Sequence, residues 1–122
     1  MGVDRTSYLL YGFKVEDEET MDFIDGEHYD DLMEEKPYSL MFNNSKSDQT
    51  IIFDGMCGNY IYIGLKLAEL DEYEDDITVE IDKDKINNLE NKLKEAMTSW
   101  PNYLSDLFKD KEPKLYFFVH AY

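Results

Sequence analysis

The chain has 122 residues, of which 28 are Asp or Glu and 12 are Lys or Arg, so its formal net charge is −16. Hydrophobic residues make up 43% and aromatic residues 15%, which predicts a folded protein rather than a disordered one. A chain of this length is expected to form one domain, residues 1–122. The charge disfavours direct binding to nucleic acid or to an anionic membrane, because both are polyanions, and it favours a basic partner.

The cysteine content and the length of the apolar segments indicate the cellular compartment of the protein. The one cysteine, Cys57, excludes an internal disulfide and is typical of a reducing compartment, so we expect a cytoplasmic protein. A helix that crosses a membrane needs about 18–20 consecutive apolar residues, and the sequence has no such run.

The first part of the chain is predicted to form a central strand followed by an acidic helix. Residues 7–15 are apolar on both alternating faces, as in a strand near the middle of a sheet. Thr20 is the expected N-cap of a helix that ends before Pro37. Its apolar positions recur at steps of three and four residues: Met21, Ile24, His28 and Leu32.

Four further strands are predicted in the middle of the chain. Residues 38–42 and 50–53 are interpreted as a hairpin with a longer loop. Residues 59–67 alternate, with Ile61, Ile63, Leu65 and Leu67 on one face, and indicate a half-buried strand. Residues 77–81 alternate as well and are expected to form an edge strand.

The last third is predicted to hold two helices and a final strand. Asp82 or Asp84 is the expected cap of a helix with one apolar stripe, formed by Ile86, Leu89, Leu93, Met97 and Trp100. Pro101 suits the first turn of a short helix, and residues 115–122 resemble a strand. The order of elements predicts an α+β domain: a mostly antiparallel sheet of five or six strands with two or three helices on one face. We expect the two terminal strands to be neighbours near the sheet centre.

Twenty of the 28 acids lie in two segments. The first acidic block, residues 16–35, has eleven acids and no Lys or Arg, and the second acidic block, residues 69–84, has nine acids and one Lys. Residues 85–114 carry six bases and five acids and are nearly neutral. The folded molecule is therefore expected to be electrically lopsided.

The sequence gives little support to metal binding or catalysis. No register of the second acidic block matches a calcium loop, which needs a Gly at its sixth position and a Glu at its twelfth. His28 lies near Asp25 and Asp31 but has no second nearby His or Cys, so we interpret it as a half-buried residue on an acidic helix. Cys57 has acids around it, which disfavour a thiolate. We expect no enzymatic activity and no cofactor.

The acidic blocks are the best candidate for a functional surface. Carboxylates four residues apart on a helix repel each other, as at Glu18 and Asp22, and each such pair destabilises the helix by about 0.2–0.5 kcal/mol unless a cation relieves it. If the two blocks are adjacent, they form one negative stripe suited to a basic protein groove. The residues expected to contact the partner are Glu18, Asp22, Asp25, Glu27, Asp30, Asp31, Glu34, Glu35, Glu72, Tyr73, Glu74, Asp75, Asp76 and Glu80.

Three alternatives remain open. The acids can be solubilising faces that also protect an edge strand from aggregation. The protein can be a module that binds a small ligand or a divalent cation, with a pocket formed by the turn DGMCGN and an aromatic sheet face. It can also be a structural subunit that associates only with itself.

Both ends of the chain resemble a group of viral proteins. The opening MGVDRTSYLLYGFKV and the closing KLYFFVHAY are similar to small uncharacterised proteins of tailed bacteriophages. In composition the chain is also similar to phage-encoded DNA mimics and inhibitors of host defence, which are short, acidic and poor in cysteine. The resemblance implies an inhibitor that binds a basic, nucleic-acid-binding host or defence protein in the bacterial cytoplasm.

Overall fold

The computed structural model describes residues 5–54, 58–71, 73, 76 and 78–121. Within this part of the chain, four strands form one antiparallel sheet in the order β2-β3-β1-β4. The strands are β1 (Arg5–Val15), β2 (Gln49–Phe53), β3 (Ile61–Asp71) and β4 (Lys114–Ala121). The helical elements are α1 (Glu18–Met21), the π-helical η1 (Asp22–Glu27), α2 (His28–Met33), α3 (Tyr38–Phe42), α4 (Lys83–Met97) and α5 (Asn102–Phe108). The predicted α+β class is confirmed, although the described residues form four strands rather than five or six, and more helices than predicted.

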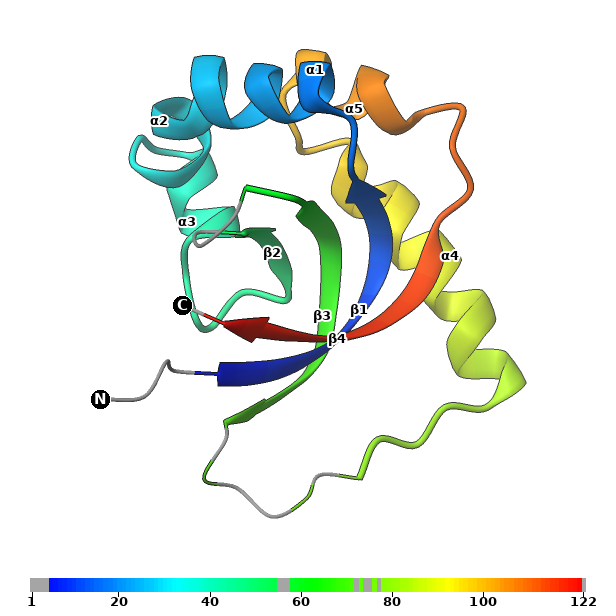
Figure 1. Ribbon diagram of the computed structural model, residues 1–122. Coiled ribbons are helices and arrows are strands. Elements are labelled where there is room, and N and C mark those ends of the chain that lie inside the picture. The colour runs from blue at the N-terminus through cyan, green and yellow to red at the C-terminus, as the bar shows by residue number, and fades with distance from the viewer. Residues whose placement is uncertain (1–4, 55–57, 72, 74–75, 77, 122) are drawn as a thin grey trace.

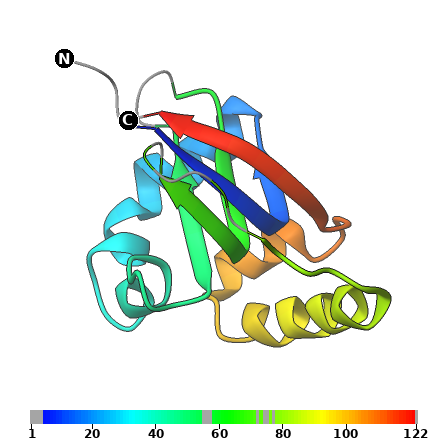
Figure 2. The same cartoon turned by 90° about the horizontal axis from the view of Figure 1, so that it is seen from below.

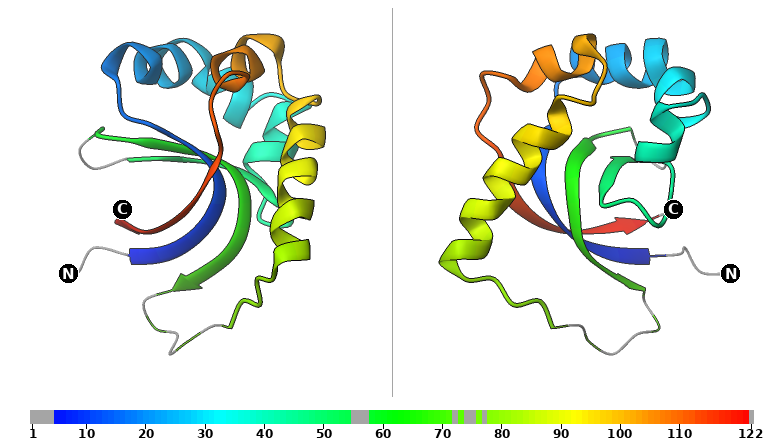
Figure 3. Two further views of the ribbon diagram at one scale, coloured as in Figure 1. Left: turned by 90° about the vertical axis from the view of Figure 1, so that its right-hand side faces the viewer. Right: turned by 180° about the vertical axis from the view of Figure 1, so that it is seen from behind.

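The two central strands bend strongly through the middle of the sheet (Figure 1, Figure 3). Leu9 of β1 lies opposite Ala68 of β3, whereas Leu10 lies opposite Lys66, so Leu67 is an extra residue in β3. Such a bulge bends its strand and increases the local twist. The two faces of this bent sheet carry separate core clusters.

The first face, here called the helical face, packs against the helices and forms the main core. Helix α4 runs along it, and the other helices gather at one end of the sheet (Figure 1). Leu93 of α4, Leu104 of α5 and Leu32 of α2 are all buried there. The strands contribute Tyr11, Phe13, Val15, Ile51, Ile61, Ile63 and Leu65 to this core. The predicted inward face of residues 59–67 is therefore confirmed.

The opposite face, here called the aromatic face, carries a smaller cluster. Leu10 and Ile52 are buried beneath a group of rings. The rings of Tyr62 and Phe118 stack with their centroids 3.7 Å apart. The other members of the group are Tyr8, Tyr60, Tyr116 and His120.

The predicted acidic helix is present, but it starts and winds differently from the prediction. The cap is Asp17, whose carboxylate accepts a hydrogen bond from the Thr20 backbone N–H at 2.9 Å, rather than Thr20 itself. A π-helical segment with hydrogen bonds of longer span, η1, separates α1 from α2 and contains Gly26. The segment 18–33 is therefore helical throughout, with a change of winding in its middle.

The predicted strand at residues 38–42 is wrong, because these residues form α3. Phe42 is buried, and Tyr38 and Met41 pack against the core, while Leu40 is exposed. That spacing of three and four residues suits a helix, but five residues are too few for the sequence to separate it from a strand. Strand β2 pairs with β3, so the predicted hairpin between 38–42 and 50–53 is wrong as well.

The predicted edge strand at residues 77–81 is also wrong in the part that the structure describes. Residues 78–82 have no regular secondary structure, and they lead into α4, whose cap is Asp82, one of the two predicted residues. The terminal strands β1 and β4 are neighbours as predicted, but β4 lies at an edge rather than near the centre. Among the described residues, no helix is both long enough and apolar enough to span a membrane.

Candidate functional site

The first acidic block lies on the outer side of the helical segment 18–33. Ile24 and Leu32 are buried and fix this segment against the core. Most of the predicted contact residues of this block are exposed, and Asp31 is half-buried. The exposed residues are Glu18, Asp22, Asp25, Glu27, Asp30, Glu34 and Glu35. The core therefore holds one side of the segment, and the carboxylates cover the other.

Few cations compensate the first acidic block. In the described part of the chain, its ion pairs are Lys14 Nζ to Glu16 Oε1 at 2.7 Å and His28 Nδ1 to Asp31 Oδ2 at 3.0 Å. Asp17 lies at the N-terminus of α1, and its hydrogen bonds with Thr20 hold the pKa of its carboxyl below the usual value. The remaining carboxylates of the block have neither a lysine nor an arginine within ion-pair distance.

His28 is a packing residue, as the sequence indicated. It is half-buried, and its ring stacks on Tyr103 with the centroids 3.8 Å apart. Burial, with help from the Asp31 carboxylate, raises the pKa of Tyr103 to about 12. In the part of the chain that the structure describes, no three His, Cys, Asp or Glu side chains are grouped to hold a metal ion.

The described residues of the second acidic block lie at the opposite end of the molecule from the segment 18–33. Figure 1 and Figure 3 place the described residues of 76–82 beyond the far end of the sheet, away from α1 and α2. Tyr73 is 88% exposed, and Asp76 and Glu80 are exposed. Glu72, Glu74 and Asp75 lie outside the described residues. The described residues of the two blocks therefore do not form one negative stripe.

The aromatic residues within the blocks differ in their surroundings. Phe23 packs inward, with its ring centroid 4.7 Å from that of His28. Tyr29 is partly exposed, and its centroid lies 5.2 Å from that of Phe53. Phe23 is thus part of the core, and Tyr29 is the aromatic residue of the first block that a partner can reach.

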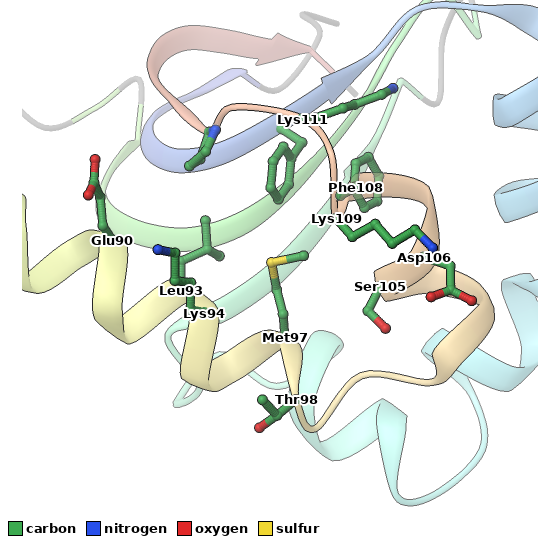
Figure 4. Close-up of a pocket in the computed structure, with 12 residues that line it drawn as sticks. Glu90, Leu93, Lys94, Met97, Thr98, Ser105, Asp106, Phe108, Lys109 and Lys111 are labelled. Atoms are coloured by element: carbon green, nitrogen blue, oxygen red, sulfur yellow. The ribbon is translucent and has the colours of Figure 1, made fainter.

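A cavity of about 470 Å³ lies between α4, α5 and the segment that leads to β4 (Figure 4). Apolar side chains form much of its wall, including Leu93, Met97 and Phe108. Its polar lining includes three lysines, Lys94, Lys109 and Lys111, and two acids, Glu90 and Asp106. This site was not predicted from the sequence, because the residues that line it come from separate segments of the chain.

The lysines of this cavity have no described acidic side chain close enough for an ion pair. No described carboxylate lies within ion-pair distance of Lys94, Lys109 or Lys111. The Lys111 ammonium lies 5.6 Å from the centroid of the Phe108 ring, in the range of a cation–π contact. An apolar wall beside uncompensated ammonium groups suits a ligand with an apolar body and an anionic end.

A cavity is present where the turn DGMCGN and the aromatic face were predicted to form a pocket. Asp54 and Gly58 of the turn line a cavity of about 740 Å³ together with Tyr8 and His120. Residues 55–57 of that turn, including Cys57, lie outside the described residues. On the aromatic face the rings pack on one another, and Tyr60 Oη lies 3.2 Å from His120 Nδ1. Burial lowers the pKa of His120, and the Asp54 carboxylate acts in the opposite direction. His120 is thus a packing residue of the aromatic face.

Comparisons with protein families, with curated proteins and with solved structures find no match to this chain.

Proposed function

We propose that this protein binds a basic surface of another protein through the outer face of the helical segment 18–33. The observation that supports this most directly is the density of exposed carboxylates there. Among the described residues, the half-buried Asp31 is the one acid of this segment with a basic side chain within 4.0 Å, His28. A partner that supplies Lys or Arg side chains relieves the repulsion among these acids. The second acidic block faces a different direction and is not part of this binding surface.

The partner class follows from the same chemistry. Grooves that bind nucleic acid are rich in Lys and Arg, because they neutralise phosphates, and a row of carboxylates competes for the same side chains. We therefore propose a nucleic-acid-binding host or defence protein as the partner and inhibition by occupancy as the mechanism. The proposal needs no catalytic group, and a bacterial cytoplasm suits a chain with one cysteine.

The test compares two variants with equal changes in net charge. The first-block variant carries Glu18→Gln, Asp22→Asn, Asp30→Asn and Glu34→Gln. The second-block variant carries Glu72→Gln, Glu74→Gln, Asp76→Asn and Glu80→Gln and serves as the matched control. Each protein is immobilised and used to capture proteins from a bacterial lysate at low and high salt.

We expect the wild type and the second-block variant to retain the same basic proteins at low salt, and the first-block variant to lose them. High salt should release them, because screening weakens contacts between exposed charges. Equal losses in both variants would show that only net charge matters. Retention of acidic proteins, or retention that salt does not change, would also contradict the proposal.

The cavity between α4 and α5 supports a second candidate function, the binding of a small amphipathic anion. Its volume of about 470 Å³ lies within the ~300–1,000 Å³ that is typical of small-ligand sites. Lys94 of α4 and Lys109 after α5 both line it, so either ammonium can pair with the anionic end (Figure 4). This function is compatible with a protein partner at segment 18–33.

Thermal unfolding with octanoate tests the second function, with octanol as the neutral control. A ligand at about 100 times its dissociation constant stabilises a protein by about 2.7 kcal/mol, so octanoate should raise the melting temperature. The double variant Lys94→Glu, Lys109→Glu should lose most of this rise, and octanol should produce less of it. An equal rise with octanoate and octanol, or an unchanged rise in the variant, would contradict a site for anions.

A further inference from the structure

Strand β4 is an edge strand that lacks the usual protection against pairing. It is bonded to β1 on one side, and Figure 2 shows no helix beyond its other side. Edge strands of natural proteins are commonly protected by charged side chains, proline or a bulge. Apart from Lys114 at its start, β4 has no Lys, Arg, Asp, Glu or Pro, and its register with β1 is regular.

Three alternate residues of β4 expose apolar side chains on the helical face of the sheet. Leu115 is 48% exposed, Phe117 is 73% exposed and Val119 is 54% exposed. They lie opposite Tyr11, Leu9 and Ser7 of β1. Because α4 and α5 cover only the other part of this face, these side chains have no helix over them.

The exposed apolar surface continues from β4 across the sheet. Phe117 lines a recess of about 260 Å³ together with Leu9, Leu70 and Val79, and no residue of a helix contributes to this lining. A connected apolar surface on an edge strand is unusual in a chain that is 33% charged. It indicates a surface that is covered in the working state of the protein.

The charge of β4 and its neighbourhood indicates which kind of protein can bind this apolar surface. Residues 113–122 contain no Asp or Glu, although the molecule as a whole carries a net charge of −16. A second copy of the same protein can therefore approach here with less repulsion than at either acidic block. A basic partner, in contrast, finds no carboxylate on β4 itself to pair with.

We propose that two copies of the protein associate through β4, with the two strands antiparallel about a two-fold axis at Phe117. This is a self-complementary contact, in which each residue of one copy meets its symmetry mate. The axis places Phe117 against Phe117 of the second copy and Leu115 against Val119 of the second copy. The two sheets join into one continuous sheet of eight strands, and the binding surface on segment 18–33 stays outside the contact.

Sedimentation equilibrium at low and high salt tests the association, over protein concentrations from about 1 µM to about 1 mM. The variant Phe117→Lys places a charge at the two-fold axis. Leu40→Lys is the matched control, because Leu40 is 55% exposed on α3 and the change in charge is the same. Far-ultraviolet circular dichroism establishes that both variants are folded.

We expect a dimer that tightens with salt, because screening weakens the repulsion between two acidic molecules and the second acidic block lies beside the contact at Val79. Phe117→Lys should weaken dimerisation by at least ~10-fold, and Leu40→Lys by less than about 2-fold. Backbone amides of β4 should exchange more slowly with solvent in the dimer.

A wild type that stays monomeric at the highest concentration and salt would overturn the proposal. A dimer that Phe117→Lys and Leu40→Lys weaken equally, or in which β4 amides gain no protection, would overturn it too. The salt effect is opposite to the one expected for a basic partner at segment 18–33, so failure of one proposal is distinguishable from failure of the other.

Discussion

At the scale of residues, two glycines allow a close backbone contact between β1 and β3. Gly12 of β1 and Gly64 of β3 are directly opposite each other near the bend. A Cβ atom on Gly12 would overlap the Ile63 carbonyl oxygen and lie 2.7 Å from the Gly64 Cα. Only the absence of a side chain at both positions lets β1 and β3 approach this closely.

Gly12→Ala should therefore lower the free energy of unfolding by at least about 1–3 kcal/mol, because the methyl group meets backbone that cannot move aside easily. Gly26→Ala is the matched control, since a Cβ atom there has no neighbour within 4 Å. It should leave stability unchanged or raise it by up to about 1 kcal/mol. Urea denaturation measures both variants, and equal effects of the two substitutions would contradict the assigned packing.

At the scale of elements, the helices and strands with a long, regular apolar pattern were predicted from the sequence. Strand β3 and helix α4 each have a long apolar pattern, and both elements were predicted. Leu89 and Leu93 of the predicted α4 stripe are buried, whereas Ile86 in the first turn is 44% exposed. Segment 38–42 was misassigned, because five residues contain barely more than one helical turn and fit either period. Strand β4 was predicted near the sheet centre, because its composition is apolar on both faces, but composition does not report which neighbours a strand finds.

Of the two candidate sites, one was predictable from the sequence and the other was not. The exposed carboxylates of the first acidic block were predictable, because acids on the outer side of an amphipathic helix remain in water. The cavity between α4 and α5 was not, because Leu93, Phe108 and Phe13 come from distant parts of the chain and only the tertiary fold brings them together. The bulge at Leu67 likewise follows from how β1 and β3 pair, rather than from a local signal.

At the scale of the whole molecule, the charge is divided between two ends. The segment 18–33 occupies one end and the second acidic block the other, with the sheet between them (Figure 1). The sequence left open whether the two acidic blocks are adjacent in space, because their distance depends on the tertiary fold of the strands and loops between them. Their separation restricts the proposed binding surface to one block and leaves β4, which has no acid, for contact between copies.

The central claim is that the first acidic block keeps its carboxylates at a cost in stability, which a cationic partner relieves. Urea denaturation of the wild type and of the first-block variant, at about 0.02 M and about 0.5 M salt, tests this claim without the partner. The variant should be more stable than the wild type by about 1 kcal/mol at low salt, and this advantage should vanish at high salt. A variant that is no more stable than the wild type at low salt would contradict the claim, because the acids would then be compensated within the molecule.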